Sequence, residues 1–355
     1  MGSTLRAGVV GLTGIGARPP IPAPKHGWGI SMPHSHASAY HFVEDTELVA
    51  VCDLRQEAID EFDVNWRSYV SEVNSYVDYR EMLDRENLDL ISVVTSDHVH
   101  TQIVIDAAEA GVKGIVCEKP IATTLADADR MIEAVEKAGI PMLIDHVYRW
   151  WFPWADVGKL IDDGAIGDVV RVMCNQGGPR AMLFRNGTHV CDTINWFSTG
   201  NPTAVYAVAE KGFEDYGPRY ASDGGHDPDT DPALSIMIEY DNDVRAFWNA
   251  CKTMPGRYIG PFDIWGTEGR IHLTNDYAVL YDDPEEGLRG RELTPTHYTQ
   301  GHIAGLVTEL VGLIRDGGEP SCDGRQARQA LEVLLAALQS QAAGNVRVQL
   351  PITDA

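Results

Sequence analysis

The fold of this chain is decided by one stretch, Gly114-Ile115-Val116-Cys117-Glu118-Lys119-Pro120, in which a short apolar run is followed at once by two charged residues and a proline. The apolar run is too short for a buried helix and is typical of a strand. Charged side chains directly after such a strand lie at the edge where open parallel sheets bind their ligands. We therefore predict that Lys119 belongs to a functional site. A lysine ammonium that is partly desolvated there loses its proton more readily and can act as a general base.

The sequence on both sides of this stretch alternates short apolar runs with segments of helical periodicity. The runs lie at residues 7–10, 48–52 and 90–94, and the helical segments at 79–83, 102–110 and 125–138. Gly111 and Gly139 follow the last two helical segments, as expected of glycines that end helices. This alternation predicts a parallel sheet covered by helices, the architecture of a dinucleotide-binding Rossmann domain.

The segment after the first strand contains the glycines that such a domain needs for the approach of a pyrophosphate. Gly11-Leu12-Thr13-Gly14-Ile15-Gly16 has the order G-x-x-G-x-G and runs into a proline-rich stretch that cannot be helical. We infer an insertion at about residues 13–27 and a helix that begins near Pro33. The cofactor contacts expected in this segment are Gly11, Thr13, Gly14, Gly29, Ile30 and Ser31.

The second strand ends at Asp53, which is followed by Leu54 and Arg55. A carboxylate at this place accepts hydrogen bonds from the ribose of NAD and repels the 2′-phosphate of NADP. Arg55 could instead hold that phosphate. The sequence therefore favours NAD as the cofactor and leaves NADP open.

Motifs in both halves of the chain together resemble those of one known family. In the first half these are Val51-Cys52-Asp53, Thr95-Ser96 with His100, Ala107-Ala108-Glu109-Ala110-Gly111 and Glu118-Lys119-Pro120. In the second half they are Tyr148-Arg149, Pro153, Gly164-Ala165-Ile166-Gly167-Asp168-Val169, Gly187-Thr188-His189-Val190-Cys191-Asp192, and Asp323-Gly324 before a helix to Ala342 and a closing strand at 346–348. Their order resembles the glucose-fructose oxidoreductase, inositol dehydrogenase and rhizopine-catabolism (Gfo/Idh/MocA) family of NAD(P)-dependent sugar and polyol oxidoreductases.

The resemblance implies roles for particular residues. Lys119 would remove the proton of the substrate hydroxyl, and His189 would be its partner in acid–base transfer. Further cofactor contacts are implied at Asp53, Leu54, Arg55, Thr95, Ser96, His98, His100, Glu118 and Lys119. The implied substrate contacts are Lys119, Arg149, Trp150, Arg185, Asn186, His189 and Asp192.

One position departs from the family pattern. Related dehydrogenases often carry an aspartate four residues before the histidine, and here Arg185 stands there. Arg185, together with Arg180 and Arg149, could bind a carboxylate or phosphate of the substrate, because a guanidinium presents a planar pair of donors. A surface network would use the same arginines. Asp192, three residues after His189 on an expected helix, could hold the imidazole or a sugar hydroxyl.

The chain after residue 146 has the character of a second domain. The aromatic run 148–154 could stack on a sugar ring or pack between domains. Strands are expected at 169–174, 204–209, 234–240, 244–250, 262–265 and 270–273. We predict an α/β chain with a Rossmann domain at 1–146 and an α+β domain at 147–355, whose large, mostly antiparallel sheet binds substrate and joins subunits into a homo-oligomer.

Metal sites are not expected. His34, His36 and His41, and separately His98 and His100, lack the cysteine or carboxylate partners of a zinc site. The acidic segment 223–231 lacks the residue order of a calcium loop and is interpreted as a solvated loop.

The composition of the chain limits the kinds of partner that it is expected to bind. A formal net charge of −24 argues against nucleic acid or an anionic membrane surface. The N-terminus leads directly into the first strand, which leaves no room for a signal peptide, and no stretch is apolar enough to span a bilayer. Six cysteines without C-x-x-C spacing are typical of a reducing cytoplasm.

These features together predict an enzyme that transfers a hydride between NAD(P) and a secondary hydroxyl of a sugar, sugar derivative or cyclic polyol. Three alternatives stay open at this point. The enzyme could use NAD transiently to eliminate a glycosidic substituent without net redox change, it could reduce a biosynthetic keto sugar, or the chain could be a regulator that only senses the dinucleotide. Lys119 and His189 argue against the regulator, because binding alone needs neither residue.

Overall fold

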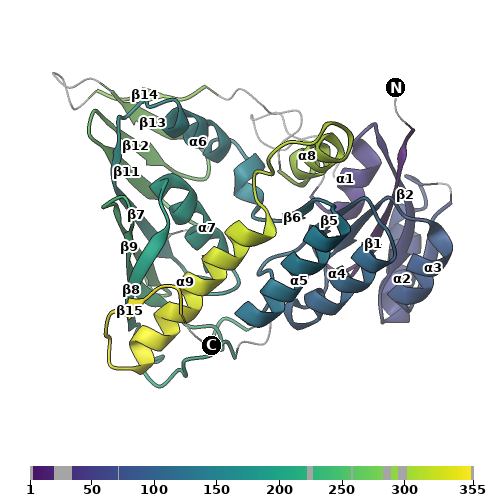
Figure 1. Ribbon diagram of the computed structural model, residues 1–355, viewed down its shortest axis with the longest axis horizontal. Coiled ribbons are helices and arrows are strands. Elements are labelled where there is room, and N and C mark those ends of the chain that lie inside the picture. The colour runs from purple at the N-terminus through teal and green to yellow at the C-terminus, as the bar shows by residue number, and fades with distance from the viewer. Residues whose placement is uncertain are drawn as a thin grey trace. The chain divides into compact units, whose positions relative to one another are not determined.

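A computed structural model describes residues 3–19, 34–70, 72–221, 227–256, 259–282, 289–294 and 302–352. The chain forms two compact units (Figure 1). The first contains Met1–Trp150 together with His297–Arg325, and the second contains Trp151–Thr296 together with Gln326–Ala355. A segment from far along the chain thus belongs to the first unit. The use of the second unit for substrate binding stays a prediction.

The first unit is built on a six-stranded sheet with the order β3-β2-β1-β4-β5-β6. All neighbouring strands described in it are parallel. The strands are β1 (Leu5–Val10), β2 (Thr46–Cys52), β3 (Asn74–Tyr76), β4 (Leu90–Val93), β5 (Gly114–Cys117) and β6 (Met142–Ile144). The order reverses between β1 and β4, and such a switch point is where open parallel sheets bind dinucleotides. The predicted Rossmann architecture is confirmed.

Helices cover this sheet. They are α1 (His36–Phe42), α2 (Gln56–Trp66), α3 (Tyr79–Glu86), α4 (His100–Glu109), α5 (Leu125–Ala138) and α8 (His302–Asp316), with short 3₁₀ turns η1 (Asp97–Val99) and η2 (Val147–Trp150). Figure 1 shows α4 and α5 side by side. Helix α8 packs on β5 because Gly114 has no side chain: a Cβ there would lie 2.8 Å from Ile314 and 3.0 Å from Leu310.

Helix α1 begins later than the sequence indicated. Its first residue is His36 and not one near Pro33, because the Ser35 side chain accepts a hydrogen bond from the backbone N–H of Ser38 (3.1 Å) and so caps the helix. Most of the inferred insertion lies outside the described residues, as do Pro33 and the expected contacts Gly29, Ile30 and Ser31.

The second unit is built on a nine-stranded sheet with the order β14-β13-β12-β11-β7-β10-β9-β8-β15. Its strands are β7 (Val169–Gly177), β8 (Pro202–Ala209), β9 (Leu234–Tyr240), β10 (Arg245–Cys251), β11 (Phe262–Gly266), β12 (Arg270–Leu273), β13 (Ala278–Tyr281), β14 (Arg291–Glu292) and β15 (Val348–Gln349). Only the pairing of β7 with β10 is parallel among those described. The predicted, mostly antiparallel sheet is confirmed, although the closing strand lies at Val348–Gln349 and not at 346–348, and β13 and β14 were not predicted.

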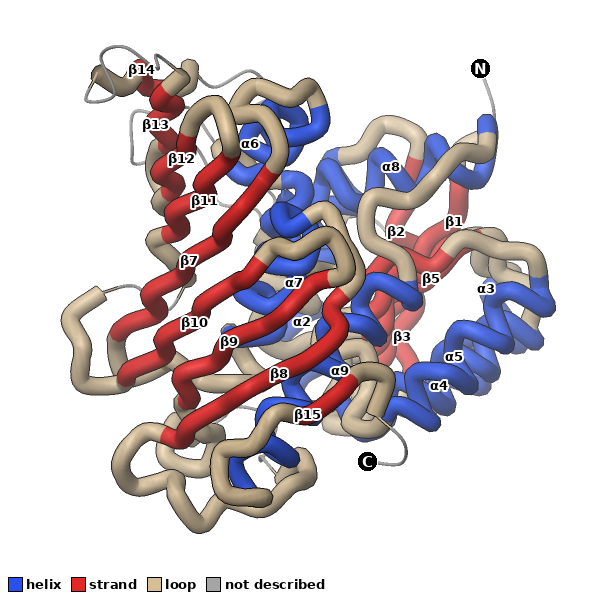
Figure 2. Tube along the Cα trace, turned by 60° about the vertical axis from the view of Figure 1, so that its left-hand side comes forward, coloured by secondary structure: helices blue, strands red, loops and turns tan. Residues whose placement is uncertain are grey.

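One face of this sheet carries the helices α6 (Trp154–Asp162), α7 (Gly187–Ser198) and α9 (Gly324–Ala342). Figure 2 looks onto the other face, where no described residue covers the strands. Burial alternates accordingly: in β10 Ala246 and Trp248 are buried, whereas Phe247 between them is partly exposed. The indole N–H of Trp248 donates to Gln176 Oε1 (3.0 Å), so this buried side chain leaves no polar group unsatisfied.

Membrane-spanning helices are not found within the described residues: none of them combines the length and apolar character that a bilayer crossing needs. The six cysteines all lie in described segments, and none of them forms a disulfide there. Five are buried and Cys251 is partly exposed.

Two glycines inside helices give a test of packing. A Cβ at Gly158 in α6 would lie 2.0 Å from the Trp196 ring of α7, whereas a Cβ at Gly312 in α8 meets no atom within 4 Å. Gly158→Ala is expected to destabilise the protein by about 1–3 kcal/mol through overpacking. Gly312→Ala is expected to stabilise it by up to about 1 kcal/mol, because alanine is the better helix former. Urea unfolding of both variants measures this, and equal effects would contradict the packing described for α6 and α7.

Candidate functional site

The loop after β1 brings its backbone close to the neighbouring strand. Gly11 has φ +95°, its N–H donates to Cys52 O (2.8 Å), and a Cβ on it would lie 2.2 Å from Val94 O. The N–H of Gly16 closes a turn onto Thr13 O (3.1 Å). Thr13 and Gly14 are exposed at the switch point. This geometry needs glycine at residue 11 and leaves backbone at residues 13 and 14 accessible to a ligand.

Asp53 lies directly beside this loop. Its Oδ2 accepts the N–H of Leu12 (3.0 Å), and its Oδ1 accepts the N–H of Arg55 (3.0 Å). The guanidinium of Arg55 is exposed, with Nε 3.5 Å from Asp53 Oδ1, and Leu54 is 86% exposed. The carboxylate therefore joins the glycine loop to the end of β2, the place where such folds bind the adenosine ribose.

The loops after β4 and β5 are joined by one buried histidine. The ring nitrogens of His100 lie 3.1 Å from Pro120 O and 3.1 Å from Thr95 O. Burial lowers the pKa of His100. Of the cofactor contacts expected here, Ser96 and His98 are exposed and Thr95 is partly buried. His100 is buried and links the loop after β4 to the loop after β5.

Lys119 and Glu118 follow β5. Lys119 is partly exposed, whereas Glu118 is buried and its Oε2 accepts the backbone N–H of Lys119 (3.1 Å). Consecutive residues at the end of a strand point to opposite sides, which separates their side chains. Glu118 is directed into the core of the first unit, toward His36.

Sequence reasoning missed the group that surrounds Glu118. The Nε2 of His36 lies 3.4 Å from Glu118 Oε1 and 3.5 Å from Asp145 Oδ2, and we call these three side chains the His36 cluster. The other ring nitrogen lies 3.0 Å from Ser92 Oγ, which in turn lies 2.8 Å from the hydroxyl of Tyr40. Asp145 follows β6 as Glu118 follows β5, and the short apolar run at 142–144 directly before it was the signal that could have found it.

The protonation of the His36 cluster follows from its burial and charges. Burial by itself lowers the pKa of His36, but hydrogen bonds to Asp145 and Glu118 outweigh it and raise the pKa to about 9. Burial and repulsion from Glu118 raise the pKa of Asp145 to about 6, against the opposite effect of His36. The raised pKa of His36 favours an imidazolium at neutral pH, beside the carboxyl groups of Glu118 and Asp145.

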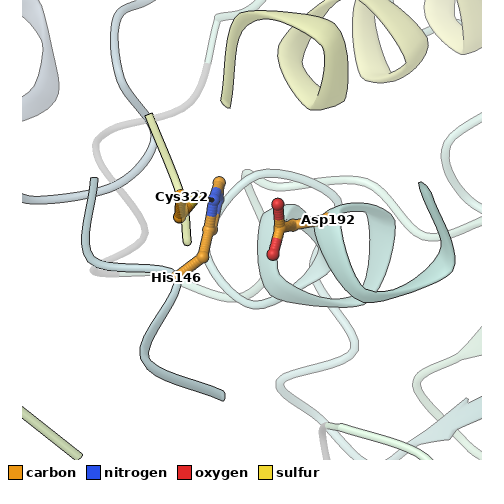
Figure 3. A group of neighbouring side chains, drawn as sticks. All are labelled: His146, Asp192 and Cys322. Atoms are coloured by element: carbon orange, nitrogen blue, oxygen red, sulfur yellow. Dashed lines mark hydrogen bonds between the residues drawn. The ribbon is translucent and has the colours of Figure 1, made fainter. Parts of the chain in front are cut away.

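A second buried pair contains His146, the residue that follows Asp145. The Nδ1 of His146 is 3.4 Å from the Sγ of Cys322, and Figure 3 shows the two side chains together. Figure 3 also shows Asp192, which projects from α7 of the second unit and is buried. Neither His146 nor Cys322 was among the expected site residues.

Arg149 and Trp150 in η2 are both anchored to the segment around α8. The Nη1 of Arg149 donates to Ser321 O (2.7 Å), and the indole N–H of Trp150 donates to Glu309 Oε2 (2.7 Å). Arg149 is buried and Trp150 is partly exposed. These bonds fix both side chains, and their expected contact with substrate stays a prediction.

Helix α7 begins at a tight junction. Gly187 packs against Trp248, whose ring would lie 2.5 Å from a Cβ at that position. His189 in the first turn is partly exposed, and Asp192 one turn later is buried. The spacing of three places both on one side of the helix, as the sequence indicated. Asn186 is buried and donates through Nδ2 to Arg180 O (2.7 Å).

Asp231 holds the loop before α7. Residues 227–230 of the acidic segment are exposed or partly exposed, in line with a solvated loop, but Asp231 at its end is not. Asp231 is fully buried and accepts the N–H groups of Phe184 (3.1 Å) and Arg185 (3.0 Å). Burial raises the pKa of Asp231 to about 6, against these hydrogen bonds. The backbone of Arg185 is therefore fixed by a carboxylate while its side chain is exposed. Residues 223–226 lie outside the described part of the chain.

Two family models match this chain. The model described as "Oxidoreductase family, NAD-binding Rossmann fold" matches residues 5–146, and the "GFO/IDH/MocA C-terminal domain" model matches residues 154–272. The chain belongs to the Gfo/Idh/MocA oxidoreductase family. Its first domain is accordingly an NAD-binding Rossmann domain, as the sequence predicted.

Known dehydrogenases resemble the chain over most of its length. D-apiose dehydrogenase from Paraburkholderia graminis is 26% identical over 337 residues, covering 87% of this chain and 85% of the relative. Myo-inositol 2-dehydrogenase from Thermotoga maritima is 25% identical over 346 residues, covering 95% and 96%. The structure of a levoglucosan dehydrogenase in complex with NADH shares the fold, with a TM-score of 0.78, 21% identity and coverage of 98% and 100%.

The position of Asp53 predicts its effect on cofactor binding. Asp53→Ala is expected to weaken NAD binding about 10- to 100-fold, because hydrogen bonds to a charged group contribute about 1.5–3 kcal/mol. Asp60→Ala, which removes an exposed carboxylate of α2, is the control and should leave the affinity unchanged. Calorimetric titration with NAD and with NADP measures both. Unchanged NAD affinity in Asp53→Ala would contradict the ribose contact, and tighter binding of NADP than NAD by the wild type would assign Arg55 to a 2′-phosphate.

Proposed function

We propose that the protein oxidises a secondary hydroxyl of a sugar, sugar derivative or cyclic polyol and transfers the hydride to NAD. The observation that carries this proposal is the place of Lys119, which is partly exposed at the carboxyl end of β5 in an NAD-binding domain. A base there can remove the hydroxyl proton while the hydride leaves the same carbon. The sugar and polyol dehydrogenases among the relatives support this substrate class.

Lys119 acts in this proposal as the general base. The positive ring of oxidised nicotinamide favours loss of a proton from a neighbouring ammonium, which suits a base that must be neutral when NAD is bound. His189 passes the proton onward or polarises the substrate hydroxyl. Asp192, which is buried one turn further along α7, orients the substrate. Arg149, Trp150 and Asn186 complete the proposed substrate contacts.

Two exposed arginines add an anionic group to the proposed substrate. Arg180 and Arg185 lie on the loop before α7, and both side chains are exposed. The backbone of this loop is held by Asp231, so that the guanidinium groups start from fixed positions. A carboxylate or phosphate on the sugar is the group that suits them.

A spectrophotometric assay tests the proposed reaction. Formation of reduced nicotinamide is followed while NAD or NADP is offered with aldoses, sugar acids, anhydrosugars and inositols. Reduction is expected with one of these classes, and Lys119→Ala is expected to lower kcat about 10²- to 10⁴-fold, the usual contribution of a positioned acid or base. Lys113→Ala, which removes an exposed lysine paired with Asp89 (2.7 Å), is the control and should keep full activity. Full activity in Lys119→Ala would rule out its role as base.

A second candidate is redox-neutral elimination with transient oxidation by bound NAD. It is favoured by Arg185, which stands where related dehydrogenases often have an acid. Tight NAD binding and cleavage of an anhydro- or glycosidic sugar without accumulation of NADH would support it. Tight binding without any turnover would favour a dinucleotide-sensing regulator. Faster reduction of a keto sugar than oxidation of its alcohol would identify a biosynthetic reductase.

We also propose that two copies of the chain associate through the uncovered face of the nine-stranded sheet. Tyr206, Met237, Phe247 and Met173 are paired in register across β8, β9, β10 and β7, and all four are partly exposed or exposed. An apolar row of this kind on an uncovered sheet is typical of a subunit interface.

Phe247→Glu is expected to dissociate the proposed homo-oligomer, because a buried charge without a partner opposes association. Analytical ultracentrifugation measures the mass. Asp162→Lys on the helix-covered side of the unit is the matched control and should keep the wild-type mass. A monomeric wild type, or an unchanged mass in Phe247→Glu, would exclude this interface.

The proposed location is the cytoplasm, where cysteines stay reduced. The absence of a disulfide among the six described cysteines and the burial of five of them support it. The net charge of −24 supports a small-molecule substrate and opposes binding to nucleic acid or an anionic membrane surface.

A further inference from the structure

The His36 cluster is more than a link between α1 and the sheet, because its charges do not cancel. Two carboxyl groups face a single imidazole, so with all three groups ionised the cluster has one net negative charge in a buried place. Glu118 is 8% exposed, Asp145 is 3% exposed and His36 is fully buried. Water screens a charge in such surroundings poorly, so its effect reaches neighbouring groups.

The place of the cluster in the sheet indicates which part of the bound cofactor its charge affects. In a Rossmann sheet of this order, the β1–β3 half receives one mononucleotide and the β4–β6 half receives the other. Asp53 at the end of β2 assigns the adenosine to the first half. Glu118 and Asp145 follow β5 and β6, so they lie at the ligand-binding edge of the half that remains for the nicotinamide.

The oxidised and reduced forms of the cofactor differ in charge at the nicotinamide ring. The oxidised nicotinamide ring carries one positive charge, and the ring becomes neutral when it accepts a hydride. A fixed negative charge therefore stabilises bound NAD⁺ and has little effect on bound NADH. Binding energy that differs between the two forms shifts their equilibrium on the protein.

We propose that the His36 cluster biases the bound cofactor toward its oxidised form, through the net negative charge that it places beneath the nicotinamide half of the sheet. The proposal rests on NAD binding by the family and not on the proposed substrate or on Lys119 as base. A unit charge about 10 Å away, at an effective dielectric of about 20, changes a binding constant roughly tenfold. For a two-electron couple a tenfold change in ratio corresponds to about 30 mV.

Three histidines near the cluster do not change its net charge. Burial lowers the pKa of His302 on α8 to about 3, and burial also lowers the pKa of His34 and of His100. These three rings are therefore neutral at physiological pH. Lys119 follows Glu118, and whenever it carries a proton its ammonium acts in the opposite sense, but equally in the wild type and in variants of Asp145.

Asp145 makes the bias dependent on pH. Above its pKa of about 6 the carboxylate is ionised and the cluster has one net negative charge. Below that pH Asp145 takes up a proton and the cluster becomes neutral. The preference for NAD⁺ over NADH is therefore expected to weaken as pH falls through about 6.

The experiment measures the dissociation constants of NAD⁺ and of NADH separately, by calorimetry at pH 7.5 and at pH 5.5. Asp145→Asn and Glu118→Gln keep the shape of each side chain and remove one negative charge. Both are expected to reduce the ratio of NADH to NAD⁺ dissociation constants roughly tenfold at pH 7.5. The wild-type ratio should fall toward that of Asp145→Asn at pH 5.5, and the ratio of Asp145→Asn should stay constant.

Asp89→Asn is the matched control. Asp89 is a carboxylate at the opposite end of the sheet, where it accepts the N–H of Arg6 (2.9 Å), and its replacement should leave the ratio unchanged. A cluster that only supports the structure would weaken NAD⁺ and NADH binding in parallel, and that outcome would overturn the proposal. A ratio independent of pH in the wild type, or a stoichiometric metal ion found by elemental analysis of the purified protein, would overturn it too. Failure of the substrate assay leaves this measurement unaffected, because it needs no turnover.

Discussion

The parallel alignment of six strands is the constraint on which the rest of the first unit depends. Because every strand runs in the same direction, the residues that follow β1, β2, β4, β5 and β6 all lie at one edge of the sheet. The glycine loop, Asp53, Lys119 and the His36 cluster meet there for that reason, although they are far apart in sequence. Gly11 completes the arrangement, since a side chain at that position would collide with the backbone of the neighbouring strand.

The elements that sequence reasoning predicted well are those with a strong local signal. Short β-branched runs gave β1, β2, β4 and β5, and helical periodicity with a terminal glycine gave α5 with its observed bounds. Helix α1 was placed too early because proline is favoured in a first helical turn, whereas the Ser35 cap three residues before Ser38 carries the decisive hydrogen bond. The short strands β3 and β14 have too few residues to show a period.

The site residues that were missed depend on distant contacts. Asp145 was given no role, and Asp231 was interpreted as part of an acidic loop, because nothing in their local sequence shows that His36 or the N–H of Arg185 lies beside them. Their burial is also opposite to the usual behaviour of aspartate. Lys119 and Asp53, by contrast, follow strands that the sequence predicted, and parallel topology alone sets where they lie.

Helix α8 completes the first unit from the far end of the chain, where Arg315 pairs with Asp45 (2.8 Å) just before β2. Because α8 lies late in the chain, the order of synthesis decides when the first unit can be completed. A ribosome that has released the first 150 residues has not yet supplied the helix that covers β5, so an apolar surface stays uncovered until residues 151–296 of the second unit and then α8 have been made. A fragment cut after residue 150 would have the same defect. The first unit is therefore complete only once the chain has been made as far as α8.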